Sequence, residues 1–181
     1  MRNAFLLFIL SVSLSYSQKK TEKIDSVSYY LELAEYNSKI NNYKNSLDYT
    51  QKAIDYAKSK SDVKAEANAS SSLGLLYFDL KKYDDAIEIL NKSIILYNKL
   101  SPSAEQAYAY YNLGLCYMEK ENYSEAETIF NKTQIIYQTI KIPDAIELLN
   151  LQKGIVYKAK GKYKLASQIF SSILAKPTDP Y

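Results

Sequence analysis

The chain has 181 residues, a formal net charge of +3 and no histidine, so it lacks the most common general base and the most common metal ligand of proteins. Its 23 basic and 20 acidic side chains are interspersed, which excludes the basic stripe typical of a nucleic-acid-binding surface. The single cysteine excludes an internal disulfide.

Residues 1–17 have the pattern of a secretory signal peptide. Arg2 precedes an apolar block from Ala4 to Leu10, and small residues around Ser15 and Ser17 mark a cleavage site after Ser17. A retained transmembrane anchor is the alternative, but a span needs about 20 apolar residues, and this block is shorter and followed by serines. The prediction is an exported protein, periplasmic or secreted, with no membrane association after cleavage and a polar leader over 18–26.

After the leader, apolar residues recur at helical spacing and no alternating strand pattern persists. The prolines lie between or after the expected helix pairs, where a helix should end. The sequence therefore predicts an all-α domain over 27–181, with helix pairs at 27–40 with 43–58, 63–80 with 83–100, 103–120 with 123–140, and 144–160 with 163–175.

These pairs repeat with a period of 40 residues. Small residues recur first, then tyrosines, then alanines: Ala34, Gly74, Gly114 and Gly154; Tyr77, Tyr117 and Tyr157; Ala86, Ala126 and Ala166. We expect each glycine to face the alanine of the following helix, which would let two helix backbones approach closely. Because one such hairpin cannot bury its own apolar face, the repeats must stack on one another.

The third copy carries the spacing that identifies a known family. Tyr110-x-x-Leu113-Gly114-x-x-Tyr117, followed by Ala126 and Phe130, resembles the tetratricopeptide repeat, here in a 40-residue variant of the usual 34. The resemblance implies a right-handed α-solenoid of four helix-turn-helix repeats, at about 27–62, 63–102, 103–143 and 144–181. The chain also resembles the exported repeat domains of bacterial sensor and regulatory proteins.

No residue pattern points to catalysis, a metal or a cofactor. Cys116 has no histidine partner and is expected to be a packed side chain. The acidic pair Asp84 and Asp85 is expected at a helix start, where carboxylates are favoured without a cation. The chain is therefore predicted not to be an enzyme, and its function is expected to be binding through its surface.

In tetratricopeptide arrays the first helix of each repeat lines a concave groove. The resemblance places these residues in the groove: Leu75, Phe78, Tyr108, Tyr111, Leu115, Met118, Leu148, Leu151 and Ile155. The set is apolar, so it suits an amphipathic helix of a partner. Alternatively, these side chains pack against one another. The family's carboxylate clamp is excluded, because Tyr111 and Leu151 occupy its positions.

The predicted function is an exported, non-enzymatic protein that binds a protein or peptide partner through this groove, without nucleic acid. One alternative is the sensory input region of a larger signalling protein, such as a histidine kinase or a helix-turn-helix regulator. Another is a non-catalytic subunit of an envelope enzyme complex. Because Ile169, Phe170 and Ile173 would leave an apolar end, end-to-end self-association is a further prediction.

Overall fold

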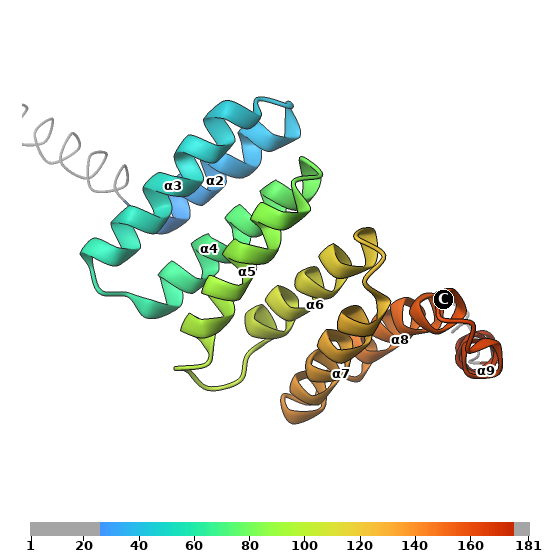
Figure 1. Ribbon diagram of the computed structural model, residues 1–181. Coiled ribbons are helices and arrows are strands. Elements are labelled where there is room, and N and C mark those ends of the chain that lie inside the picture. Colours follow the sequence, from blue (N-terminus) through green and yellow to red (C-terminus); the bar gives the residue numbers. More distant parts are fainter. Residues whose placement is uncertain (1–25, 176–181) are drawn as a thin grey trace, which may run out of the picture. The chain divides into compact units, whose positions relative to one another are not determined.

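The computed structural model describes residues 26–175, so the predicted signal peptide and most of the leader lie outside the described residues. Within 26–175 the chain is all-α, as predicted, and eight helices follow one another in pairs (Figure 1). Their bounds are α2 (Val27–Lys39), α3 (Tyr43–Ser59), α4 (Val63–Asp79), α5 (Tyr83–Tyr97), α6 (Ala104–Glu119), α7 (Tyr123–Thr139), α8 (Pro143–Ala159) and α9 (Tyr163–Leu174). The chain divides into two compact units, with the boundary between Ala69 and Ser70 inside α4.

Local capping explains where several helices begin. The Ser26 Oγ accepts a hydrogen bond from the Tyr29 amide at 3.1 Å, and the Ser103 Oγ accepts one from the Gln106 amide at 3.2 Å. A serine in extended backbone before the first turn satisfies an amide that has no carbonyl partner within the helix. At α8, Pro143 occupies the first turn, where its missing amide hydrogen is not needed.

The helices end in a recurring turn with one left-handed residue. After α6, the amide of Glu121 donates to the Met118 carbonyl and the amide of Asn122 donates to the Tyr117 carbonyl, both at 2.8 Å. This is the Schellman arrangement, in which the residue after the helix has a positive φ. The same turn follows α2, α3, α4, α7 and α8, with the left-handed position filled by Asn41, Ser61, Lys81, Lys141 and Gly161.

In the first unit, α2 and α3 pack as an antiparallel pair. Ala34 is buried, and its carbonyl accepts a hydrogen bond from the Ser46 Oγ at 2.8 Å. Ser46 occupies the position that is alanine in the later repeats, so the small-residue columns of the two helices do lie side by side here.

In the second unit, Gly74, Gly114 and Gly154 are buried beneath one large side chain of the following helix. A Cβ added at Gly74 would lie 2.6 Å from Cγ of Leu90, and one at Gly154 would lie 2.5 Å from Cε1 of Phe170. At Gly114 the ring of Phe130 is in the same place. Each of these glycines therefore faces the helix that follows it. The nearest atoms, however, belong to the large residue four positions after the alanine, because that residue lies one helical turn further along the same face.

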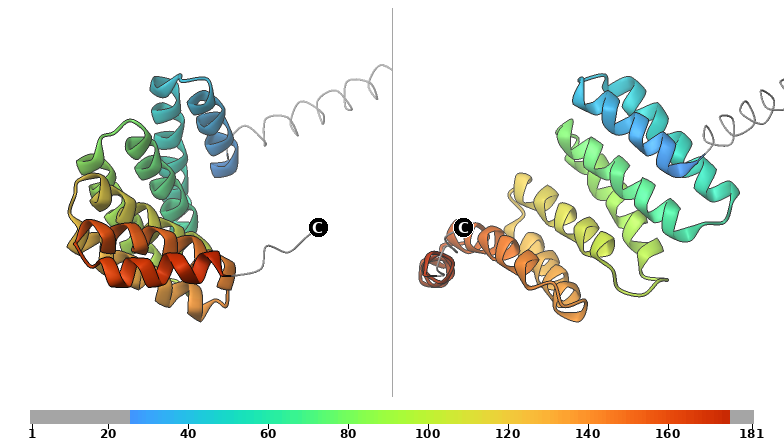
Figure 2. Two further views of the ribbon diagram at one scale, coloured as in Figure 1. Left: turned by 90° about the vertical axis from the view of Figure 1, so that its right-hand side faces the viewer. Right: turned by 180° about the vertical axis from the view of Figure 1, so that it is seen from behind.

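The core around the third and fourth repeats joins three helices. Ala126 and Phe130 of α7 are fully buried together with Leu149 and Val156 of α8. Helix α7 contacts α6 on one side and α8 on the other, and α8 lies alongside α9 (Figure 2). Of the predicted repeat positions, Ala86, Ala126 and Ala166 are buried, whereas Tyr77, Tyr117 and Tyr157 are half-buried.

Among the described residues, no helix combines the length and the apolar character that crossing a membrane requires.

Candidate binding surface

Helix α8 is apolar on two faces. Leu149 and Val156 are fully buried, but Leu148, Leu151 and Ile155 remain exposed by 68%, 43% and 40%. These three side chains follow an i, i+3, i+7 spacing, so they form one stripe along the helix. The core of the unit therefore covers the first pair completely and leaves the second set partly exposed.

Helix α6 extends this apolar surface through Tyr108, which is 47% exposed. Three residues further on, Tyr111 is half-buried and its ring lies 5.9 Å from that of Phe130, centroid to centroid. A hydrogen bond with Gln152 connects Tyr111 to α8. The exposed residues of α6 and α8 are therefore held on neighbouring elements of one unit. We call Tyr108, Leu148, Leu151 and Ile155 the apolar stripe.

The other predicted groove residues lie in a different environment. Tyr111, Leu115 and Met118 are half-buried and pack against the core cluster of Phe130, Leu149 and Val156. Leu75 and Phe78 on α4 are also half-buried, and the Phe78 ring lies 5.6 Å from the ring of Tyr83. Some of the predicted positions therefore pack within the unit, and four are exposed.

Two residues near the stripe, Tyr137 and Gln152, were absent from the sequence prediction. Tyr137 of α7 packs against the same core, and burial raises its hydroxyl pKa, with further contributions from Tyr111 and Tyr108. The pKa of Tyr111 is also raised by burial, although the hydrogen bond with Gln152 opposes the shift. The positions of Tyr137 and Gln152 fall outside the repeat columns used in the prediction, so the 40-residue period gave no signal for them.

The junction between α7 and α8 carries a group of polar side chains. The Lys160 Nζ donates to the Glu127 carboxylate at 2.6 Å, and the Lys162 Nζ lies 3.4 Å from it. The hydrogen bond from Lys160 holds the pKa of Glu127 below its usual value. The Lys153 Nζ donates to the Gln134 Oε1 at 2.7 Å, and burial lowers the pKa of this lysine. These groups are used in pairing the two helices.

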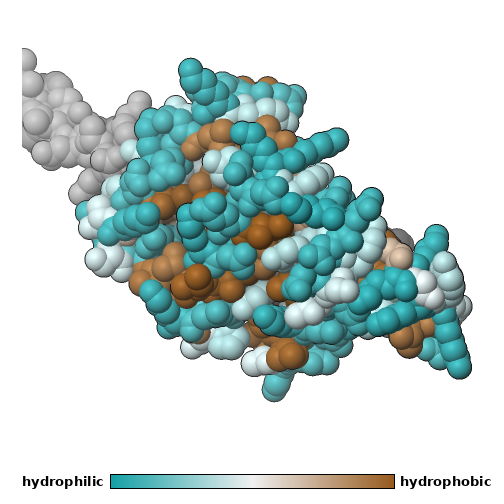
Figure 3. Space-filling view, viewed as in Figure 1, coloured by the Kyte–Doolittle hydropathy of each residue, from teal (hydrophilic) through white to brown (hydrophobic). Residues whose placement is uncertain are grey.

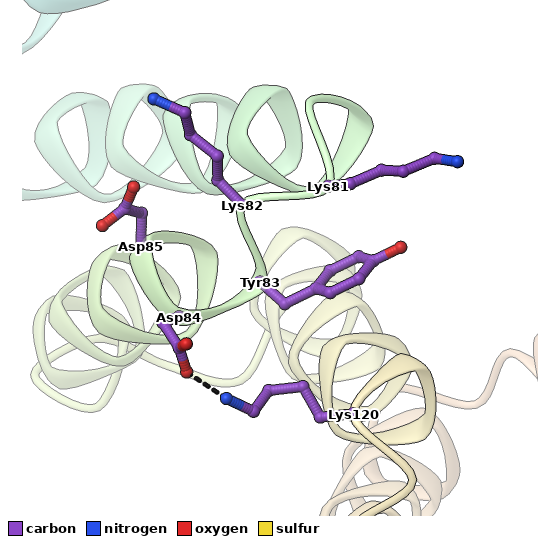
Figure 4. Close-up of a pocket in the computed structure, with 6 residues that line it drawn as sticks. All are labelled: Lys81, Lys82, Tyr83, Asp84, Asp85 and Lys120. Atoms are coloured by element: carbon purple, nitrogen blue, oxygen red, sulfur yellow. Dashed lines mark hydrogen bonds and ion pairs between the residues drawn. The ribbon is translucent and has the colours of Figure 1, made fainter.

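A shallow open pocket lies at the start of α5, and its side chains diverge (Figure 4). Asp84 pairs with Lys120, while the Lys81 side chain extends away from those of Lys82 and Asp85. The Lys82 amine lies 5.9 Å from the centroid of the Tyr77 ring. Because its charged groups are paired or directed outward, this pocket has no convergent set that could hold a ligand.

The described residues contain no grouping of acidic or cysteine side chains suited to a metal ion. Cys116 is fully buried, and burial raises the pKa of its thiol to about 12. A neutral buried thiol is a poor nucleophile, so it has the packing role expected from the sequence.

On the face seen in Figure 3, polar and charged residues surround separate apolar patches. No single large apolar area dominates that face.

Comparison with known proteins agrees with this architecture. Residues 65–139 match the tetratricopeptide repeat family. No curated protein matches the sequence.

Solved structures share the fold at low sequence identity. BtubC (BKLC) from P. vanneervenii is 18% identical with a TM-score of 0.71, over 86% of this chain and 67% of that one. A Rap protein complexed with competence and sporulation factor is 20% identical with a TM-score of 0.71, over 82% of this chain and 42% of that one. The Rap conjugation gene regulator of plasmid pLS20, in complex with the Phr* peptide, is 16% identical with a TM-score of 0.69. That match covers 89% of this chain and 45% of the regulator, so this chain spans less than half of either Rap protein.

Proposed function

We propose that this chain, a tetratricopeptide-like array of paired helices, is an exported, non-catalytic binding protein. Its apolar stripe of Tyr108, Leu148, Leu151 and Ile155 holds an apolar segment of a protein or peptide partner. The observation that carries this proposal is the second apolar face of α8, which remains exposed after the core is complete.

The composition of the stripe favours an amphipathic helix as the ligand. Three aliphatic side chains and one tyrosine are exposed by 40–68%, and none of the four is charged. Burying a leucine, isoleucine or aromatic side chain fully contributes roughly 1.5–3 kcal/mol, so each stripe residue that a partner covers offsets part of the cost of association. Helix-in-groove recognition uses apolar anchors at i, i+3 or i+4, and i+7, the spacing that α8 itself presents.

A comparison with a solved structure also supports a binding function. A structural neighbour with this fold is a regulator in complex with the Phr* peptide, so the fold is compatible with peptide binding.

The stripe can be tested with substitutions that leave the core intact. A Leu148→Asp, Leu151→Asp double variant places charge on exposed positions, and an Ile95→Asp, Ile135→Asp variant is the matched control, because these isoleucines are 60% and 62% exposed elsewhere. We expect peptides selected by the wild-type protein from a random library to bind the control normally and the stripe variant at least tenfold more weakly. Equal affinity for all three proteins would rule out the stripe as the binding surface.

Export forms a separate part of the proposal and is supported by the signal-like pattern of residues 1–17. Cell fractionation and amino-terminal sequencing of the mature protein test it. We expect an envelope or secreted fraction and a first residue of Gln18, whereas an intact Met1 in the cytoplasm would contradict it.

A second candidate function is the input region of a larger signalling protein. It is favoured by the likeness to Rap structures, of which this chain spans 42% and 45%. The reading frame beyond Tyr181 distinguishes the two, because the input-region hypothesis requires a signalling domain there.

A further inference from the structure

The contact between one repeat and the next has a defined register in the second unit. The second helix of a repeat, α7, packs against the first helix of the following one, α8. Phe130 and Ala126 meet Leu149 and Val156 in one buried cluster. Around it, Gln134 bonds to Lys153, 19 residues later, and Glu127 bonds to Lys160, 33 residues later.

Helix α9 is also a second helix, and the face that should meet a following repeat is open. Leu174 corresponds to Gln134 and is 83% exposed. Tyr163 corresponds to Tyr123, which packs against the core cluster, yet Tyr163 is 69% exposed. Phe170 is only half-buried, whereas the equivalent Phe130 is completely buried. In Figures 1 and 2, α9 lies at the edge of the second unit.

Helix α2 is a first helix, and the face that should meet a preceding repeat is open as well. Tyr36 corresponds to Val156 and is 62% exposed, whereas Val156 is fully buried. Ile40 corresponds to Lys160 and is 54% exposed. Leu33, the equivalent of Lys153, is half-buried. Thus α2 presents one half of the repeat-to-repeat contact, and α9 presents the other half.

We propose that two copies of this chain associate head to tail, with α2 of one copy packed on α9 of another in the register used between α7 and α8. In that register, Leu174 meets Leu33 of the second copy, in place of the Gln134–Lys153 pair. Ser167 meets Ile40 of the second copy, in place of the Glu127–Lys160 ion pair.

The α9 face and the α2 face differ from the α7–α8 contact in matching ways, and this match indicates a second copy of the chain as the partner. Between α7 and α8, each of these two contacts joins a polar acceptor on α7 to a lysine on α8. At the equivalent positions, α9 has no charged acceptor and α2 has no lysine, so neither face would bury an unpaired charge at these contacts. Burying a charge without a partner is strongly unfavourable, whereas the contact of Leu174 with Leu33 buries apolar surface on both sides. Charged side chains remain close by, but Glu35 is already paired with Lys39 on α2 at 2.6 Å.

This contact is heterologous, because two different faces meet. Such a contact closes into a ring or continues as an open chain, and in both cases the mean size rises from that of the monomer as the concentration increases. None of the contact residues belongs to the apolar stripe, so this inference does not depend on the proposed function.

Sedimentation velocity of the full chain across a hundredfold concentration range tests the proposal with single variants of each face. Leu174→Asp and Tyr36→Asp both replace exposed side chains, so the fold should be retained. Ile135→Asp, at 62% exposure outside both faces, is the control. We expect wild type and the control to grow with concentration and each face variant to stay monomeric.

Mixing the two face variants gives the decisive result. Leu174→Asp retains a working α2 face and Tyr36→Asp retains a working α9 face, so a one-to-one mixture should form a dimer that grows no further. A wild-type chain that stays monomeric at the highest concentration would overturn the proposal. A closed dimer that is abolished by Leu174→Asp but unaffected by Tyr36→Asp would also overturn it, since that pattern requires α9 to meet α9.

Discussion

At the scale of single residues, five of the six left-handed helix-end positions in the described chain carry a side chain other than glycine. An L-residue in this conformation costs roughly 1–2 kcal/mol, because its Cβ crowds the backbone. Only Gly161, with a φ of 71°, avoids that cost. These turns are therefore held by the hydrogen bonds and packing of the helices that they join, rather than by local preference.

Replacing one of these residues by glycine should stabilise the protein. We expect Glu121→Gly to raise the free energy of unfolding by about 0.5–1 kcal/mol, after allowing for the greater freedom of glycine in the unfolded chain. Gly161→Ala should lower it by roughly 1 kcal/mol through backbone strain alone, because an added Cβ would meet no atom within 4 Å. Urea denaturation measures both changes. Lys132→Gly, in the exposed middle of α7, is the control and should destabilise by about 1 kcal/mol.

Gly114 makes a different demand, because the Phe130 ring occupies the space that a side chain would need. We expect Gly114→Leu to lower the free energy of unfolding by roughly 1–3 kcal/mol, since overpacking must displace that ring or separate the helices. Thermal and urea unfolding provide the measurement, and Lys132→Leu on the exposed side of α7 should stay within about 0.5 kcal/mol of wild type. An unchanged melting temperature for Gly114→Leu would contradict the packing described above.

At the scale of helices, the junction of α7 with α8 differs from the junction of α5 with α6. Gln134 and Lys153 bond to each other, whereas the equivalent positions one repeat earlier hold Ile94 and Leu113, both buried. Because burial lowers the pKa of Lys153, its charged form is disfavoured where it lies. The fourth repeat is thus attached by a more polar contact than the third.

Restoring the apolar pair should strengthen this attachment. We expect the Gln134→Ile, Lys153→Leu double variant to gain about 1–3 kcal/mol of unfolding free energy, because two poorly solvated polar groups are replaced by packed apolar ones. A double-mutant cycle should show that the two changes are coupled, since either one alone leaves a polar group facing an apolar one. Strict additivity of the single variants would show that the two side chains do not depend on each other.

The helix limits could be predicted from sequence because local signals mark them. Short polar turns separate the helices of each pair, Pro143 lies at the start of α8, and the observed limits lie within three residues of the predicted ones. The residue above each glycine could not be predicted by the same means. The 40-residue period marks Ala126 and Phe130 equally well as repeat positions. Only the way in which α6 and α7 pack determines which of the two side chains covers Gly114.

The candidate surface was also predictable only in part, because repeat spacing is visible in the sequence and the packing of neighbouring helices is not. Spacing alone gives Leu115 and Ile155 the same position in the repeat, but Leu115 packs against the core cluster and Ile155 is 40% exposed. The difference depends on what the next helix brings to that place, and the sequence of one helix does not contain this information. Tyr137 and Gln152 were missed because their contacts with neighbouring helices follow no repeat column.

At the scale of the whole molecule, buried weak acids link stability to alkaline pH. Burial raises the pKa of Cys116 from 9.0 to about 12, and it raises the phenol pKa of Tyr97, Tyr111 and Tyr137 above the usual 10.0. In the unfolded chain these groups lose their protons first, so the unfolded state binds fewer protons than the folded state in this range. The free energy of unfolding must then fall as pH rises through that window.

We therefore expect the urea midpoint to decrease steadily from about pH 9 upward and the protein to be least stable near pH 12. Circular dichroism at a series of pH values provides the measurement. Cys116→Ala should begin from a lower stability but show a shallower decline just above pH 9, because the thiol no longer contributes. A midpoint that stays constant up to pH 11 would contradict the assigned burial.

Cys116 also offers a means of observing the protein in motion without altering it. Cys116 is the only cysteine in the sequence, and its side chain is fully buried on α6. A thiol-specific dye can therefore react only in the moments when the third repeat separates from its neighbours. When reclosing is fast, the labelling rate of the natural protein gives the opening equilibrium of that repeat directly, and a ligand that holds α6 in place would be detected as slower labelling.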